Sequence, residues 1–131
     1  MKQESNGVYS FPLFTPYFCR MFLEELDNYK ATGLPIRRPN SMNRYGLIVN
    51  EIGMRERISQ LQRRVLQPVA ALLFPVEGSH FDSHHSFMVQ YRHGEDTGLD
   101  MHTDDSDVTF NVCLGKNFTG ATLTICGMGG T

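Results

Sequence analysis

The chain has 131 residues, of which 40% are hydrophobic and 20% are charged, a composition typical of one globular domain. Its formal net charge is −2, which argues against a protein that binds nucleic acid or a membrane surface through net charge. The three cysteines include no C-x-x-C pair and predict reduced thiols. No secretion signal and no apolar run of membrane-spanning length occurs, so a cytoplasmic or nuclear protein is expected.

The first part of the chain predicts a capped helix. Residues 1–10 are polar and are expected to form a loose N-terminus. Thr15 followed by Pro16 is typical of a helix start, because a hydroxyl caps the first turn and proline fits the first helical position. Gly33 is the expected end of this helix. Between these limits, apolar residues recur at helical spacing: Phe18, Met21, Phe22, Leu26 and Tyr29.

A second helix is predicted over residues 55–74, with a kink near Pro68, because proline lacks the N–H that an internal helical position uses. His84 and His85 follow it and are predicted to be ordinary strand-end residues. Helices first and antiparallel strands afterwards indicate an α+β domain. Runs rich in β-branched and aromatic residues predict four strands, at 46–52, 85–92, 108–114 and 122–126.

His102 and Asp104 form the candidate metal site. Residues two apart in an extended segment point to the same face, so the imidazole and the carboxylate can meet one metal ion. Two histidines and one carboxylate on one face of an octahedron are the ligand set of non-haem iron(II) oxygenases. By itself, a His-x-Asp motif is short, and a surface loop remains an equal alternative.

The sequence around this motif resembles the iron(II)/2-oxoglutarate-dependent oxygenase family, in its prolyl- and lysyl-hydroxylase-like branch. The stretch YRHGEDTGLDMHTDDSDVTFNVCL carries most of the likeness. Upstream, QPVAALLFP and RPNSMNRYG are similar to a subgroup of oxygenase-domain-containing proteins related to procollagen hydroxylases. The family features appear here as Tyr91, the glycine-containing loop 94–98, His102-x-Asp104, the T-x-N-V-x-L run 109–114, and Phe118-Thr119-Gly120.

The resemblance implies a fold and its boundaries. The fold expected is α+β, with N-terminal helices packed on a partial double-stranded β-helix, the jelly-roll core of these oxygenases. Residues 11–131 would form the N-terminal part of the oxygenase domain. Within it, residues 15–75 would provide helical support, and residues 84–131 would provide barrel strands.

The resemblance also implies a site. His102 and Asp104 would bind Fe(II), 2-oxoglutarate would be the cosubstrate, and L-ascorbate is a further expected cofactor. Tyr91 matches a family tyrosine that hydrogen-bonds 2-oxoglutarate, with a barrel-lining aromatic as the equal alternative. Asn111 is a second candidate for the cosubstrate pocket, against the equal alternative of an amide bonded to neighbouring backbone.

Two family features are missing from the second half of the sequence. The family places another histidine, and then a basic residue that pairs with 2-oxoglutarate, well after the aspartate. No histidine follows Asp104, and Lys116 is the only later basic residue. A C-terminally truncated domain that is inactive by itself is therefore expected. The alternatives are a non-catalytic isoform or fragment that acts as a binding module, and a metal-free jelly-roll module. The substrate, a protein or a small molecule, is not indicated.

Overall fold

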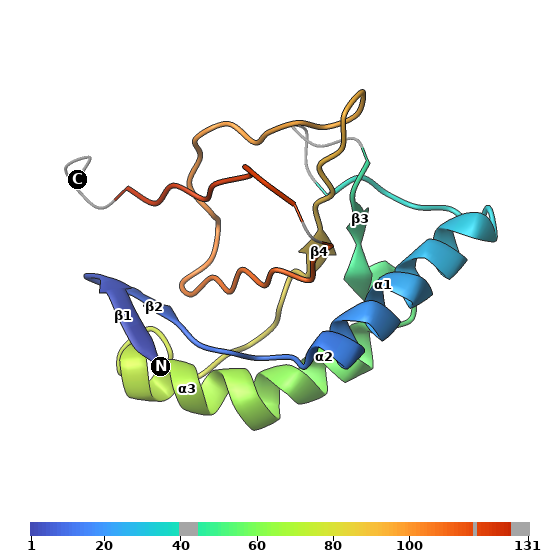
Figure 1. The fold of residues 1–131 in the computed structure, drawn as a ribbon. Helices are drawn as coiled ribbons and strands as arrows, with labels where there is room; N and C mark the ends of the chain where they lie inside the picture. Colours follow the sequence, from blue (N-terminus) through green and yellow to red (C-terminus); the bar gives the residue numbers. More distant parts are fainter. Residues whose placement is uncertain (40–44, 117, 127–131) are drawn as a thin grey trace.

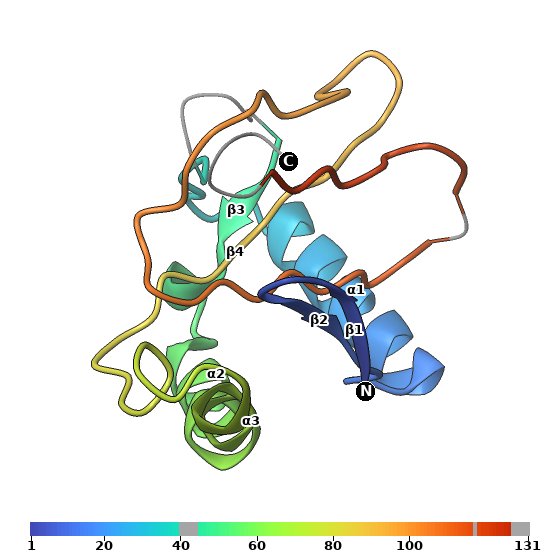
Figure 2. The same cartoon turned by 90° about the vertical axis from the view of Figure 1, so that its left-hand side faces the viewer.

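In the computed structural model, which describes residues 1–39, 45–116 and 118–126, the helical segment 55–73 lies below a two-stranded sheet of residues 47–48 and 87–88, and the helix of residues 16–31 runs beside this sheet (Figure 1). Most of the chain after the last strand winds as an irregular coil above the helices in both views (Figures 1 and 2). No helix of the described residues is long and apolar enough to cross a membrane. The elements are β1 (Lys2–Ser5), β2 (Val8–Ser10), α1 (Pro16–Ala31), β3 (Leu47–Ile48), η1 (Val49–Glu51), α2 (Arg55–Leu61), η2 (Gln62–Leu66), α3 (Gln67–Leu73) and β4 (Phe87–Met88).

The N-terminal ten residues form a hairpin, which corrects the prediction of a loose terminus. Strands β1 and β2 pair antiparallel, with Ser5 opposite Val8. The intervening Asn-Gly pair is a strong hairpin signal, and Gly7 takes a φ of +75° that suits glycine. The ring of Tyr9 packs edge-on against Phe74, 5.8 Å between centroids, so the hairpin is attached to the end of α3.

Helix α1 confirms the predicted capped helix. The side chain of Thr15 accepts a hydrogen bond from the backbone N–H of Phe18 at 3.1 Å, and proline occupies the first turn. At the other end, the N–H of Gly33 donates to the carbonyl of Lys30. Gly33 has a φ of +73°, the left-handed conformation in which helices commonly stop.

The second predicted helix is continuous but irregular in the middle. A π-helical turn, η2, separates α2 from α3, and the N–H of Gln67 donates to the carbonyl of Gln62. Pro68 follows at once and has no N–H for the carbonyl four residues earlier, so a regular α-helix cannot run through this point. The predicted interruption is confirmed, and it takes the form of a wider turn just before the proline.

The core lies where α1 meets the short sheet. Strands β3 and β4 pair antiparallel, with Leu47 opposite Met88. Leu26 of α1 is 1% exposed and packs with Leu47 and Val49, so one helix, one strand and η1 share a cluster. Partly buried side chains surround it: Phe22, Ile52, Met54, Ile58 and Met88.

The predicted strands are shorter than expected or not formed. Of 46–52, only Leu47–Ile48 is a strand, because the chain turns into η1 directly afterwards. Of 85–92, only Phe87–Met88 is paired. Residues 108–114 and the run 122–126 form no strand in the described part of the chain. A strand needs a second segment to accept its backbone hydrogen bonds, and none of the described segments pairs with these two.

A side chain at position 46 is expected to destabilise the fold. A β-carbon at this position would overlap the backbone carbonyl oxygen of Met88 and approach the ring of Pro39 at 2.9 Å. Because the first neighbour is backbone within a paired strand, it cannot move aside without breaking the sheet. We expect Gly46→Ala to lower the free energy of unfolding by about 1–3 kcal/mol, the usual cost of overpacking.

The matched control for this substitution is Gly98→Ala. A β-carbon at Gly98 would meet no atom within 4 Å. Urea unfolding followed by circular dichroism should therefore show a lower midpoint for Gly46→Ala and an unchanged one for Gly98→Ala. Equal midpoints for the two variants would mean that β3 and β4 are not packed as closely as described.

Candidate metal centre

His102 and Asp104 lie in the irregular segment that follows β4. The imidazole Nε2 of His102 is 3.1 Å from Oδ1 of Asp104, as predicted for residues two apart on one face. The two side chains are 37% and 45% exposed. This pair is therefore open to a solvated ion, unlike an ion pair enclosed in a core.

The orientation of the His102 ring is set by its other nitrogen. Nδ1 lies 2.7 Å from the backbone carbonyl oxygen of Asp100. A carbonyl oxygen only accepts, so Nδ1–H must donate, which leaves Nε2 directed at the carboxylate. In metal sites the same arrangement fixes the tautomer in which Nε2 offers a lone pair.

The protonation of His102 follows from these contacts. The hydrogen bond to the Asp100 carbonyl, followed by the nearby carboxylate of Asp104, raises the pKa of His102 above its ordinary value. Without a metal, the protonated ring and the carboxylate form a surface ion pair. A cation and the proton therefore compete for Nε2, and metal binding at this pair weakens as the pH falls.

The pair fits two ligand positions of one cation. Ligand atoms held about 2.1 Å from a metal and at right angles to each other lie about 3 Å apart. The observed separation of 3.1 Å matches this spacing. Among the described residues, no group of three His, Cys, Asp or Glu side chains comes together to hold a metal. The geometry therefore supplies a pair of ligands, and a third is not found in the described part of the chain.

The other two predicted site residues are not joined to this pair. No hydrogen bond between described residues connects Tyr91 or Asn111 to His102 or Asp104. Tyr91 is partly exposed, and burial, followed by the nearby Asp96, raises the pKa of its phenol. Contact of Tyr91 and Asn111 with a cosubstrate stays a prediction.

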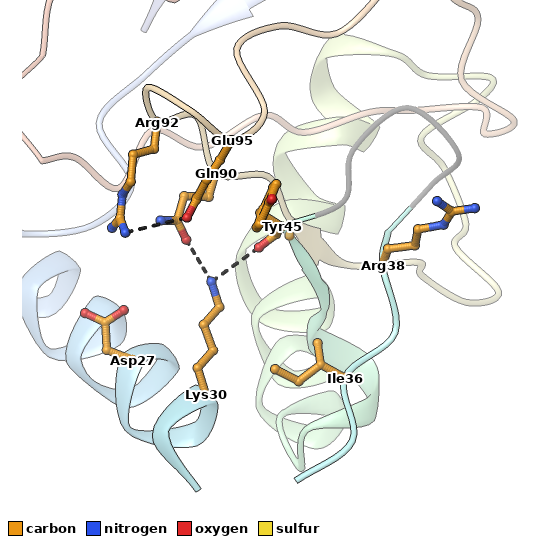
Figure 3. Close-up of a pocket in the computed structure, with 9 residues that line it drawn as sticks. Asp27, Lys30, Ile36, Arg38, Tyr45, Gln90, Arg92 and Glu95 are labelled. Atoms are coloured by element: carbon orange, nitrogen blue, oxygen red, sulfur yellow. Dashed lines mark hydrogen bonds and ion pairs between the residues drawn. The ribbon is translucent and has the colours of Figure 1, made fainter. Parts of the chain in front are cut away.

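A separate cavity of about 400 Å³ lies between α1 and the chain after β4 (Figure 3). Lys30 projects into it, and its ammonium donates to Oε1 of Gln90 at 2.7 Å and to the carbonyl of Tyr45 at 3.4 Å. Burial lowers the pKa of Lys30. Arg92 Nη1 is 3.9 Å from Glu95 Oε1, and both residues line the side of the cavity that the chain after β4 forms (Figure 3). The sequence analysis did not predict this cavity, because its walls come from segments some sixty residues apart.

His84 holds β4 to η1 and α2, a role that the sequence analysis did not predict. Asn50 Oδ1 accepts from the backbone N–H of Ser86, so Asn50 Nδ2 points at His84 Nδ1, at 3.1 Å. The same Nδ1 lies 2.8 Å from Ser86 Oγ, and Nε2 lies 3.0 Å from Ser59 Oγ, so both ring nitrogens have hydrogen-bond partners. The ring is a neutral structural bridge.

This bridge predicts a pH dependence of stability. Burial is the main cause that lowers the pKa of His84, so the folded state favours the neutral ring. The stability that the neutral His84 ring contributes is fully present above the pKa of the unfolded chain, near 6.5. It is lost as the pH falls through the lower pKa of the folded state. We expect the melting temperature to fall between pH 7 and pH 5, and to fall less steeply in His84→Gln.

His80→Gln is the control for this pH series, because the side chain of His80 is 78% exposed. Thermal unfolding of wild type and both variants at several pH values gives the three slopes. A wild-type slope in His84→Gln, or a flattened slope in His80→Gln, would contradict the structural role of His84.

Comparison with known proteins places the chain in a family. Residues 1–79 match the model of the OGFOD2-like domain. The chain belongs to the OGFOD2-like domain family. The matched part holds the hairpin, all the helices of the described residues and strand β3, and it ends before His102 and Asp104. The family model therefore does not cover His102 and Asp104.

Relatives of this OGFOD2-like chain extend the match further. The human "2-oxoglutarate and iron-dependent oxygenase domain-containing protein 2" is 42% identical over 127 residues, which cover 95% of this chain and 36% of the human protein. The Arabidopsis thaliana oxygenase domain-containing protein ICU11 is 37% identical over 133 residues, covering 98% of this chain and 34% of that protein. The rat procollagen lysine hydroxylase and glycosyltransferase LH3 is 28% identical over 121 residues, covering 87% of this chain and 16% of LH3.

The chain spans about a third of the length of the curated oxygenase-domain relatives that it matches. The names of these relatives identify an iron- and 2-oxoglutarate-dependent oxygenase domain in each. No solved structure matches the chain.

Proposed function

We propose that this chain is part of an iron(II)- and 2-oxoglutarate-dependent oxygenase domain, in which His102 and Asp104 are two of the iron ligands. The observation that carries the proposal is the 3.1 Å separation of His102 Nε2 and Asp104 Oδ1, with Nδ1 already bonded to the Asp100 carbonyl. The names of the relatives supply the cosubstrate and the metal of this proposal.

The roles of the chain's own residues follow from their chemistry. His102 offers the Nε2 lone pair, and the Asp104 carboxylate offers one oxygen and neutralises part of the cation's charge. Tyr91 is proposed to hydrogen-bond 2-oxoglutarate, and Asn111 to line its pocket. When bound, iron would supply the chemistry by which dioxygen oxidatively decarboxylates 2-oxoglutarate and hydroxylates a C–H bond.

The remainder of the centre is proposed to come from outside these 131 residues. A third ligand and a basic partner for 2-oxoglutarate complete the site in this proposal, together with the strands that close a jelly-roll core. L-ascorbate is proposed as a supporting reductant. The substrate is proposed to be a protein or a small molecule rather than nucleic acid or a membrane, in the cytoplasm or the nucleus.

The second candidate is a non-catalytic binding module. It is favoured by one observation, that no third metal-binding side chain joins the pair among the described residues. The two candidates differ in whether the pair binds iron at all, because a binding module needs no metal.

Calorimetric titration with Fe(II) under argon, with and without 2-oxoglutarate, tests the proposal. We expect measurable binding that is weak and readily reversed by a chelator, because two ligands hold a cation less firmly than three. In air, the chain alone should form no succinate above a His102→Ala, Asp104→Ala control. An absence of iron binding would reject the proposed function and favour the binding module. Succinate formation that depends on both residues would instead show that the chain is active without a further segment.

A further inference from the structure

Two hydroxyl groups lie on the side of Asp104 that faces away from His102. The hydroxyl of Thr109 is 2.9 Å from Asp104 Oδ2, and the hydroxyl of Ser106 is 2.9 Å from that of Thr109. These residues belong to the turn that directly follows the metal pair. The carboxylate is therefore contacted at both oxygens, Oδ1 by the imidazole and Oδ2 by Thr109.

The direction of each hydrogen bond can be assigned. An ionised carboxylate only accepts, so the Thr109 hydroxyl donates to Oδ2. A hydroxyl has one proton, and this one is used, so the Thr109 oxygen accepts from Ser106. Two hydrogen bonds therefore run in one direction, from Ser106 to Thr109 and from Thr109 to Asp104. Hydrogen bonds to a charged acceptor are shorter and stronger than those between neutral groups.

We propose that Thr109 is a positioning residue for the metal site, which holds Oδ2 so that Asp104 presents only Oδ1 toward His102 and the cation. This inference rests on the proposed function of the pair. An exposed aspartate rotates freely about its terminal bond and can offer either oxygen, or both. With Oδ2 engaged, the carboxylate would hold a cation through Oδ1 alone and would not occupy a second position on it.

This role differs from that of a residue that only stabilises the turn. Such a residue would act in the same way whatever the orientation of the carboxylate. Thr109 instead contacts the one oxygen that His102 does not contact. Groups that hold a metal ligand in place typically change metal affinity by 10–100-fold when they are removed.

The test compares Thr109→Val, which is isosteric but lacks the hydroxyl, with Thr109→Ser, which keeps it. Fe(II) affinity is measured by calorimetry on the full chain under argon, and the melting temperature is measured for each variant. We expect Thr109→Val to bind Fe(II) at least about tenfold more weakly, with an unchanged melting temperature. Thr109→Ser should bind within about threefold of wild type. Ser106→Ala should weaken Fe(II) binding less than Thr109→Val, because it removes the hydrogen bond from Ser106 to Thr109 and leaves the one from Thr109 to Asp104.

The outcomes separate the inference from the function on which it rests. If His102→Ala weakens Fe(II) binding and Thr109→Val does not, the positioning role is wrong and the metal site stands. If neither variant weakens binding, both are wrong. If Thr109→Ser is as impaired as Thr109→Val, or if the affinity and the melting temperature fall together, Thr109 acts on the fold and the inference is overturned.

Discussion

The His102→Ala variant is expected to bind Fe(II) at least about a hundredfold more weakly than the wild-type chain, since loss of a ligand should exceed the 10–100-fold effect of losing its supporting groups. The substitution removes Nε2, one of the two ligand atoms of the proposed site, and no group of three metal-binding side chains among the described residues replaces it. Asp104 would then be a single exposed carboxylate, and carboxylates alone hold divalent iron poorly at this exposure. Calorimetry under argon measures the difference.

Two controls match this substitution. His93 is an exposed loop histidine, and Asp105 is an exposed aspartate next to the metal pair. We expect His93→Ala and Asp105→Ala to bind Fe(II) like the wild type, and Asp104→Ala to behave like His102→Ala. Iron binding that survives His102→Ala but is lost in His93→Ala would move the site elsewhere in the chain.

The second large effect is expected in the core. Leu26 is 1% exposed and lies against Leu47 and Val49, where helix α1 meets the sheet. Truncation to alanine removes buried apolar surface and leaves a cavity, so Leu26→Ala should lower the free energy of unfolding by about 2–5 kcal/mol. Few described side chains are fully buried, and a domain with a small core has a small free energy of unfolding. Helix α1 should therefore lose most of its hydrogen-exchange protection.

Leu72→Ala is the matched control, because the same residue type on α3 is 76% exposed. Urea unfolding of this variant should give a free energy of unfolding within about 0.5 kcal/mol of the wild-type value, as for most surface substitutions. Similar losses for Leu26→Ala and Leu72→Ala would mean that the cluster around Leu26 is not the core of the folded chain.

The features that the sequence predicted correctly are local ones. Helix α1 follows from the Thr15 cap, the adjacent proline and the apolar spacing up to Gly33, all of which act within a few residues. The proximity of His102 and Asp104 is equally local, because two residues of extended chain place both side chains on one face. The interruption before Pro68 depends only on a missing N–H.

The features that sequence analysis missed depend on distant segments or on loop bends. Residues 108–114 have strand-like composition, but a strand also requires a partner, and composition does not supply one. The contact of Lys30 with Gln90 joins α1 to the chain after β4, across sixty residues. The role of Thr109 depends on how the chain bends after Asp104, although only five residues separate the two.

The central claim, that His102 and Asp104 hold the metal together, is tested most directly by paramagnetic broadening in nuclear magnetic resonance spectra. The chain is labelled with nitrogen-15, and substoichiometric Fe(II) is added under argon. Signals of atoms that lie close to the ion then broaden first. Our account predicts early loss of the His102 imidazole signals and of the Asp104 backbone amide signal, while those of His80 and His85 persist. Broadening that begins at another histidine, or that affects all of them equally, would contradict it.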